Sequence, residues 1–247
     1  MCGGALLGTL GVRSDGVAVR QCERCRMGVV AVRPLDPTAE YSDAYYFGAG
    51  ASATGYADYQ MVATHSLGWV AAFIRLLCAQ GKVLDVGCAD GHLLRLLDGS
   101  FDCLGIEVNA RFRKQCQRTG IRVLGADICD RELLVESRDR FDIITAIAVL
   151  EHVTDIRSAL ENIHTLLAAE GVLIFEVPLI AAGGEDRVWF SSSMEHIYYP
   201  TAEGLEYLFE SVFAMPLIGR EVVIREYGST FVGLATRSAT RHRQLTN

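Results

Sequence analysis

Two carboxylates and two glycines lie close together in the segment Val83–Leu94, where a short apolar run meets a turn. Asp85 stands near the end of the apolar run, and Gly87, Asp90 and Gly91 follow before an apolar helical stretch. Glycine lets a backbone turn approach a ligand closely, because it has no Cβ. A helix N-terminus that receives a phosphate favours anions and would not be lined with carboxylates. The segment therefore predicts a site for a nucleoside that carries positive charge.

Further acidic residues stand where neighbouring strands would end. Glu107 closes the apolar segment 103–107, and Asp127 follows the segment 121–124. Ligands of open parallel sheets bind outside the carboxyl ends of the strands, where an acidic residue can accept hydrogen bonds from a ribose. For Asp127 the alternative is a cap of a helix that begins near residue 130. An NAD-type oxidoreductase is the weaker reading, because the turn lacks the Gly-x-Gly-x-x-Gly spacing that a pyrophosphate needs.

Alternating strands and helices must position these residues. We expect strands near 82–86, 103–107, 121–124, 141–147 and 171–177, and helices near 58–80, 91–98, 109–119, 130–136, 155–168 and 201–210. Buried parallel strands read as continuous apolar runs, as residues 143–149 do. Right-handed crossovers then give a doubly wound sheet. Residues 222–224 and 230–235 predict an antiparallel pair at one edge.

Five segments resemble, in order, the motifs of the class I S-adenosylmethionine-dependent methyltransferases. They are Val83–Gly91, Gly105–Asn109, Gly125–Ile128, Phe141–Val153 and Gly171–Pro178, with Ala89 where the family pattern has glycine. The resemblance implies an α/β fold: a doubly wound, Rossmann-like, seven-stranded, mostly parallel sheet with an antiparallel edge hairpin. It also implies S-adenosylmethionine as cofactor, bound by Asp85, Gly87, Cys88, Ala89, Asp90, Gly91, Glu107, Val108, Asp127, Ile128, Ala148 and Val149. Tyr56 is expected to close over the cofactor, with packing of its helix on the core as the alternative.

Two histidines follow strands at the same edge of the predicted sheet. His152 lies in Leu150–Val153, and His196 lies in Met194–Pro200, which resembles a family segment that lines the acceptor pocket. A base is needed only if the nucleophile arrives protonated. His196 is the first candidate, with His152 and Glu195 beside it, against a structural role in holding the loops. The expected reaction is in-line transfer of a methyl group to a small-molecule acceptor, a secondary-metabolite or sugar intermediate. O-, C- and N-methylation stay open, as does a non-catalytic S-adenosylmethionine-binding protein.

The N-terminal residues carry a cysteine cluster. Two short strands, 17–22 and 27–32, flank Cys22-Glu23-Arg24-Cys25 and predict a small β knuckle with zinc-binding spacing. The chain here resembles methyltransferases, sugar C-methyltransferases among them, that have an N-terminal zinc module followed by a tyrosine-rich stretch. A structural zinc normally takes four ligands, whereas only Cys2 stands in the region of the first pair. Cys2, Cys22 and Cys25 are therefore either an incomplete zinc site or a degenerate one.

Composition limits the remaining classes. The 247 residues divide into a cysteine-containing module (1–37), an aromatic-rich lid and helix (38–81), a methyltransferase domain (82–237) and a tail (238–247). The net charge of −7, without a basic stripe, argues against nucleic-acid binding. No apolar run reaches the roughly 20 residues of a membrane span, and the eight cysteines favour a reducing, cytoplasmic location. We expect a monomer or homodimer.

Overall fold

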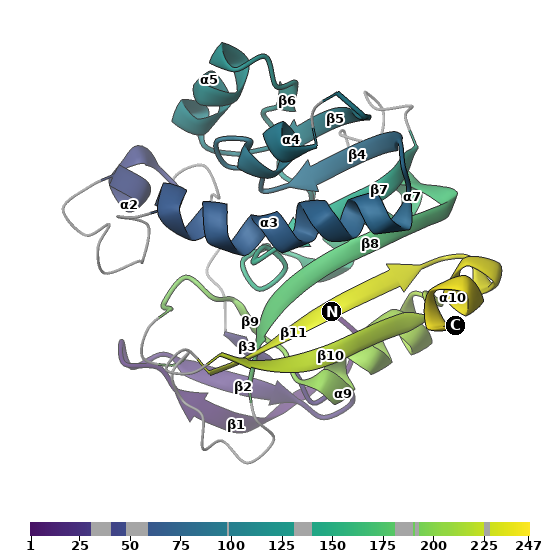
Figure 1. The fold of residues 1–247 in the computed structure, drawn as a ribbon. Coiled ribbons are helices and arrows are strands. Elements are labelled where there is room, and N and C mark those ends of the chain that lie inside the picture. The colour runs from purple at the N-terminus through teal and green to yellow at the C-terminus, as the bar shows by residue number, and fades with distance from the viewer. Residues whose placement is uncertain are drawn as a thin grey trace.

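The computed structural model describes residues 1–30, 41–47, 59–97, 99–130, 140–180, 190, 193–224 and 228–247. These residues form a large sheet covered by helices and a small N-terminal sheet beside it (Figure 1). The predicted helix 130–136 lies almost wholly outside the described residues, and Tyr56 lies outside them entirely. Within the described ranges, no helix combines the length and apolar character that a membrane crossing requires.

The large sheet has the predicted topology. Its seven strands are, in spatial order, β10 (Leu217–Ile224), β11 (Gly228–Thr236), β8 (Leu167–Leu179), β7 (Phe141–Ile147), β4 (Gly81–Val86), β5 (Phe101–Ile106) and β6 (Val123–Leu124). The pairs from β8 to β6 are parallel, whereas β11 pairs antiparallel with both β8 and β10. The prediction of a mostly parallel, Rossmann-like sheet with an antiparallel edge is confirmed.

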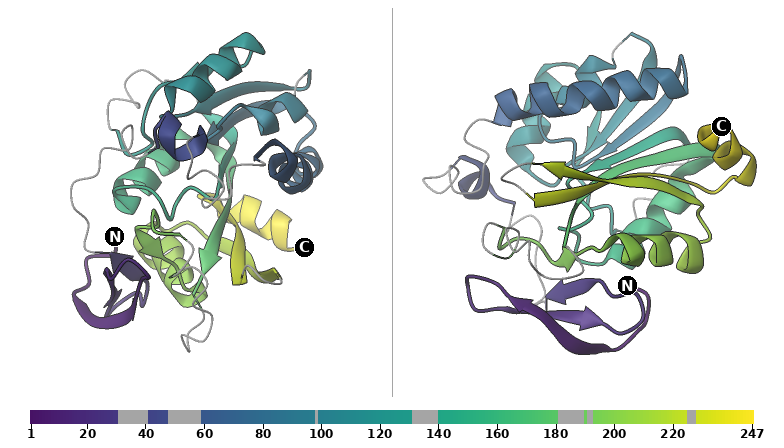
Figure 2. Two further views of the ribbon diagram at one scale, coloured as in Figure 1. Left: turned by 90° about the vertical axis from the view of Figure 1, so that its left-hand side faces the viewer. Right: turned by 60° about the horizontal axis from the view of Figure 1, so that its bottom comes forward.

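Helices cover both faces of this sheet, which is why its central strands carry mostly apolar side chains on both faces. Side chains of α3 (Tyr59–Leu77), α4 (His92–Leu96) and α5 (Ala110–Arg118) pack with Val83 and Ile143 on one face. Side chains of α7 (Ile156–Leu166), α9 (Ala202–Glu206) and the π-helical turn Tyr207–Val212 pack with Leu84 and Ile144 on the other. Successive strand residues point to opposite faces, so each strand contributes to both hydrophobic clusters. Figure 2 shows α3 lying along one face of the sheet.

The small sheet joins the N-terminus to a distant segment. Its antiparallel order is β1 (Leu6–Val12), β2 (Ala18–Cys22), β3 (Gly28–Val30) and β9 (Tyr198–Tyr199). The sequence predicted β2 and β3, but it did not predict β1 or the pairing of β3 with β9. Strand β1 leaves Leu7 two-thirds exposed. A Cβ on Gly28 would lie 2.9 Å from Tyr199 Cβ, so the close approach of β3 to β9 needs glycine here.

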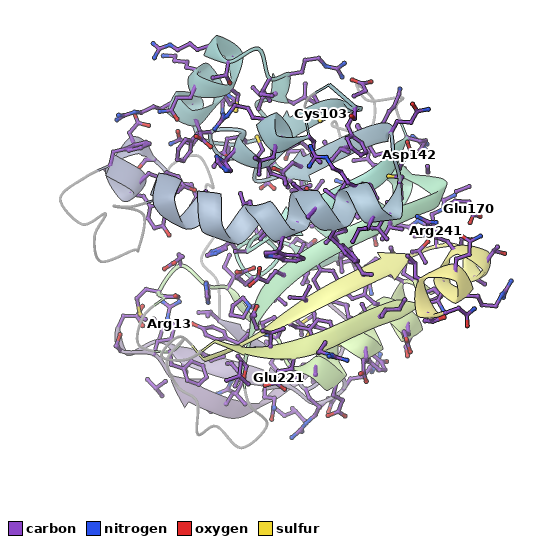
Figure 3. All side chains as sticks on the ribbon, in the orientation of Figure 1. Arg13, Cys103, Asp142, Glu170, Glu221 and Arg241 are labelled. Carbon is purple, nitrogen blue, oxygen red and sulfur yellow. The ribbon has the colours of Figure 1, made fainter. Side chains whose placement is uncertain are left out.

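Residues 238–247, expected as a tail, form mainly the helix α10 (Ala239–Thr246). Ser238 caps it by accepting a hydrogen bond from Arg241 N at 3.0 Å, and Ser238 Oγ lies 2.8 Å from Glu170 Oε1. Arg241 Nη2 donates to Leu77 O at 3.0 Å, at the end of α3. Figure 3 shows Glu170 and Arg241 together at this side of the molecule. The helix therefore belongs to the packed domain.

Candidate active site

A cavity of about 500 Å³ lies at the carboxyl ends of the parallel strands. It brings together residues at or just beyond the carboxyl ends of β4, β5, β6, β7 and β8, far apart in sequence. Of the predicted cofactor-binding residues, those that line it are Asp85, Gly87, Cys88, Ala89, Glu107, Val108, Asp127, Ile128, Ala148 and Val149. The topology of the sheet, rather than any local motif, makes them neighbours.

The turn after β4 forms one wall of the cavity. Gly87 N and Cys88 N donate to Ile106 O at 2.9 and 3.1 Å, which ties this turn to the end of β5. Gly87 has φ +70°, and a Cβ there would lie 2.7 Å from Val149 Cγ2. Ala89 has φ +45°, a left-handed conformation that costs a non-glycine residue about 1–2 kcal/mol. The turn thus requires glycine at one position and is strained at the other.

Glu107 is held between two backbone segments. Its side chain is buried; Oε2 accepts a hydrogen bond from Ala89 N at 2.9 Å, and Oε1 accepts one from Asn109 N at 2.7 Å. Burial raises its pKa, while these backbone donors act in the opposite direction. A carboxylate has about four acceptor positions, so Glu107 keeps acceptor capacity for a ribose diol.

Asp85 is also buried, beneath the same turn. It accepts a hydrogen bond from Thr145 Oγ1 at 2.6 Å. Burial raises its pKa to about 7; the bond from Thr145 lowers it and the charge of Glu107 raises it further. A cation beside a buried carboxyl group whose pKa is close to the solution pH stabilises the ionised form of that group.

Two predicted cofactor residues do not line the cavity. The Asp90 carboxylate accepts from His92 N at 3.1 Å and pairs with Arg95 at 3.0 Å, at the start of α4. Gly91, with φ +78°, precedes the same helix. Asp127 does line the cavity, and its Oδ1 accepts from Cys129 N at 2.9 Å. Burial raises the Asp127 pKa.

Two tyrosines of the N-terminal half line the cavity, whereas the predicted Tyr56 lies outside the described residues. Tyr41 and Tyr46, beside the short helix α2 (Asp43–Phe47) and within it, line the cavity. Asn109 Nδ2 donates to Tyr41 O at 2.9 Å, and Tyr46 packs edge-on against Phe112 at 4.8 Å. The tyrosine-rich composition of this stretch was the available signal, but it did not identify which ring would face the site.

The far end of the cavity carries a cluster of Glu151, His152 and His196. One ligand-type atom from each lies within 4.8 Å of the others, and the two imidazole rings are 4.7 Å apart. Two backbone hydrogen bonds join the segment after β7 to the segment that follows His196: Ile197 N and Tyr198 N both donate to Glu151 O, at 2.8 and 3.0 Å. The structure thereby places both predicted histidines at one point.

Burial controls the charge of this cluster. It raises the pKa of Glu151 to about 8 and lowers that of His152 to about 4. Burial, with the charges of His152 and Arg13, lowers the pKa of His196 to about 2. Both imidazoles are therefore neutral at pH 7. Glu195 lines the cavity as predicted, as does Glu176, which accepts a hydrogen bond from Thr230 Oγ1 at 3.1 Å.

The N-terminal sheet holds the loop that carries His196. Arg13, labelled in Figure 3, donates through Nη1 to Met194 O at 2.5 Å and His196 O at 3.2 Å. Its Nε donates to Asp15 Oδ1 at 3.1 Å, which fixes the guanidinium. Sequence reasoning did not single out Arg13, because nothing local links it to a residue about 180 positions away.

The three N-terminal cysteines also meet. Cys2, Cys22 and Cys25 are buried, their sulfurs lie within 4.8 Å of one another, and Cys2 Sγ is 3.4 Å from Cys22 Sγ. Thiolate groups at this spacing suit a tetrahedral zinc ion, for which they would provide three of four ligands.

The arrangement suits S-adenosylmethionine, which has a sulfonium, an ammonium and a ribose but no phosphate. The cavity offers buried carboxylates at Asp85 and Glu107 beside a close backbone turn. Carboxylates stabilise the sulfonium and ammonium cations and accept hydrogen bonds from the ribose hydroxyls, whereas they would repel a pyrophosphate.

Comparisons with known proteins agree. The chain is 33% identical over 112 residues to the ubiquinone biosynthesis O-methyltransferase of Azotobacter vinelandii, a match that covers 43% of this chain and 47% of that protein. The chain thus spans about half the length of this curated relative.

Two solved structures share the fold. One is the 1,6-didemethyltoxoflavin-N1-methyltransferase of Burkholderia thailandensis with its substrate and S-adenosylhomocysteine bound; the TM-score is 0.57 at 17% identity, over 85% of this chain and 95% of that one. The other is the plantazolicin methyltransferase BamL in complex with S-adenosylhomocysteine and a triazolic desmethyl analogue; the TM-score is 0.63 at 12% identity, over 79% and 94%. The methyltransferase domain profile matches residues 61–212, well over half of the chain. The chain therefore belongs to the methyltransferase domain family and has the fold of S-adenosylmethionine-dependent methyltransferases.

Proposed function

We propose that this enzyme methylates a neutral or cationic small molecule, a natural-product or sugar intermediate, bound beside Glu151, His152 and His196. One observation carries the proposal: a single cavity joins the carboxylates suited to the cofactor with the histidine cluster. Methyl transfer needs an electrophile and a nucleophile aligned in one enclosed space.

Three carboxylates and the turn after β4 hold S-adenosylmethionine at the cofactor end of the cavity. When bound, S-adenosylmethionine supplies an electrophilic methyl group on a positively charged sulfur. Glu107 accepts hydrogen bonds from the ribose, Asp127 accepts from the adenine amine, and Asp85 favours the cationic methionine part. The turn 87–89 gives the backbone its close approach, and its anchoring to Ile106 keeps that approach fixed.

The histidine end handles the nucleophile and its proton. His196, with His152 and Glu195 beside it, lies where an acceptor would meet the methyl group. Both imidazoles are neutral at pH 7, so each is in the protonation state in which an imidazole can accept a proton from an acidic group of the acceptor. Arg13 fixes the loop from behind and serves as a positioning residue.

Charge narrows the class of acceptor. Glu176 and Glu195 line this end, whereas the described lining includes neither lysine nor arginine. Carboxylates in a partly enclosed cavity repel anions, so phosphorylated acceptors are disfavoured. The curated relative named above is an O-methyltransferase of ubiquinone biosynthesis, which supports a hydroxyl group as the first acceptor to test.

The test is formation of S-adenosylhomocysteine from S-adenosylmethionine with a panel of acceptors: a dihydroxybenzene, a free aminosugar, a simple amine and a nucleotide sugar. We expect turnover with uncharged hydroxyl or amine acceptors and none with the nucleotide sugar. Turnover confined to the nucleotide sugar would contradict the proposed acceptor class. Calorimetry should show binding of S-adenosylhomocysteine and no binding of NAD.

A structural role fits the cysteine trio. We propose that Cys2, Cys22 and Cys25 hold one zinc ion that stabilises the N-terminal sheet, in a reducing, cytoplasmic setting that keeps all eight cysteines free. Metal analysis of protein purified without chelator tests this: the Cys22→Ser variant should hold about one zinc ion per chain fewer than the wild type. Less than about a tenth of an equivalent in the wild type contradicts it.

A further inference from the structure

The cluster at the acceptor end has the composition of a metal site. Glu151, His152 and His196 provide two imidazoles and one carboxylate, and Glu151 Oε1 lies 3.7 Å from His152 Nε2. Two ligand atoms of a tetrahedral zinc site, with bonds of about 2.0–2.2 Å, are separated by about 3.3–3.6 Å. The observed spacing is a few tenths of an ångström wider, which side-chain rotation can close.

Two atoms of the cluster are buried without a hydrogen-bond partner among the residues that the structure describes. They are Glu151 Oε2 and His152 Nδ1, and the Glu151 side chain is 1% exposed. A buried carboxylate oxygen without a partner costs free energy. Since both atoms belong to residues that line the cavity, a ligand that enters the cavity can satisfy them.

The backbone fixes these groups before any ligand arrives. Glu151 and His152 follow β7, and His196 precedes β9. The two bonds to Glu151 O hold the segments in register, and Arg13 holds the His196 carbonyl from the N-terminal sheet. Fixed ligands on separate elements are what a preorganised metal site needs.

We propose that Glu151, His152 and His196 bind a divalent transition-metal ion, Zn²⁺ or a close analogue, with an open coordination position toward the cavity. Two histidines and one glutamate form a known type of catalytic zinc set, with three protein ligands and one open position. Imidazole ligands disfavour Mg²⁺ and Ca²⁺, which take oxygen donors. Glu176 and Glu195 add negative charge to the same cavity, while the charge of Arg13 is offset by its ion pair with Asp15.

The catalytic consequence rests on the function proposed above. An acceptor hydroxyl at the open position becomes more acidic, because the ion stabilises its anion. The hydroxyl releases its proton to solvent, the oxygen forms a bond to the methyl carbon, and the carbon–sulfur bond breaks with its electron pair staying on sulfur. The products are the methyl ether, S-adenosylhomocysteine and one proton. The site therefore favours hydroxyl acceptors and O-methylation.

The experiment is a Co²⁺ titration of the full chain after chelator treatment, followed by visible and near-ultraviolet absorbance. Co²⁺ bound by thiolates of the cysteine trio absorbs in the near ultraviolet and in the visible, so the titration is made in the Cys22→Ser background, where imidazole and carboxylate ligands give the remaining visible bands. Glu151→Gln and His196→Gln should weaken the Co²⁺ binding seen in the visible bands at least a hundredfold. Cys22→Ser by itself should remove the near-ultraviolet signal and the visible bands of the cysteine site, and His242→Gln, on α10, is the matched histidine control.

Binding of S-adenosylhomocysteine checks that each variant is folded, and His152→Gln replaces any variant that fails this check. Absence of visible bands in Cys22→Ser protein, or equal Co²⁺ affinity in that protein and its folded Glu151 and His196 variants, overturns the metal site. If methylation of a hydroxyl acceptor then persists in chelator, the proposed function stands and His196 acts without a metal. If Co²⁺ binds as expected but no acceptor of any class is methylated, the site stands and the proposed acceptor function fails.

Discussion

The two ends of the cavity satisfy their buried polar groups in different ways. At the cofactor end, both oxygens of Glu107 accept backbone hydrogen bonds, and Asp85 accepts one from Thr145. At the acceptor end, Glu151 Oε2 and His152 Nδ1 have no such partner within the described part of the chain. Native proteins pair nearly all buried polar atoms. Among the described residues, the carboxylates of the first end thus have partners within the protein, whereas the second end has two buried polar atoms that a ligand can satisfy.

A second difference concerns where the residues come from. The carboxylates at the cofactor end stand within or next to strands of one sheet, and hydrogen bonds within the β4–β5 unit fix the turn between them. The acceptor end is assembled from the β7 exit, the loop before β9 and the N-terminal sheet. Substitution of residues distant from the cavity should therefore affect the acceptor end and leave the cofactor end unchanged.

The largest effect is expected from Glu107→Ala. It removes an acceptor for the ribose and the partner of Ala89 N, so we expect the Kd for S-adenosylhomocysteine to rise about a hundredfold. Hydrogen bonds to charged groups contribute about 1.5–3 kcal/mol each. Calorimetry measures this, with Glu161→Ala on the exposed side of α7 as the control carboxylate. An affinity within twofold of the wild type would remove Glu107 from the ribose site.

A substitution directly after β1 of the N-terminal sheet should affect acceptor turnover without affecting cofactor binding. Arg13→Gln removes the bonds to Met194 O and His196 O, so we expect kcat/KM for the acceptor to fall about tenfold. The Kd for S-adenosylhomocysteine should stay within twofold. Arg20→Gln, an exposed arginine of β2, is the matched control. Equal loss of cofactor affinity and acceptor turnover would mean that Arg13 supports the fold as a whole.

The cofactor end should respond to pH through Asp85. Its pKa is about 7, so it is mostly ionised at pH 8 and mostly protonated at pH 6. Protonation removes the negative charge that favours the cationic cofactor, so the Kd for S-adenosylmethionine should rise about tenfold from pH 8 to pH 6. Binding measured across this range in wild type and Asp85→Asn checks it, and the variant should show a flatter profile. An identical slope in the variant would assign the effect to another group.

The smallest effect concerns the strained turn. Ala89→Gly removes the Cβ at φ +45°, and we expect the free energy of unfolding to rise by about 1 kcal/mol. Urea denaturation measures it, with Ala168→Gly, at a half-buried position of β8, as the control. A stability loss in Ala89→Gly would show that the alanine methyl contributes packing that outweighs the strain.

Much of the cofactor end could be predicted from local patterns. Asp85, Glu107 and Asp127 each follow or end an apolar run, and parallel topology carries such positions to one edge of the sheet. Asp90 shows the limit of this reasoning: its place in the motif suggested a ligand contact, but the side chain pairs with Arg95. The direction in which a turn residue points depends on the helix that follows.

The sequence by itself determined the mostly parallel sheet, its antiparallel edge and the family, because apolar periodicity and motif order act over short stretches of chain. Only the tertiary structure decided that Glu151, His152 and His196 meet, that β9 completes the N-terminal sheet, and that Arg13 reaches the loop of His196. Such contacts join residues separated by tens to more than a hundred positions. Their geometry follows from how whole elements pack, and no local pattern records it.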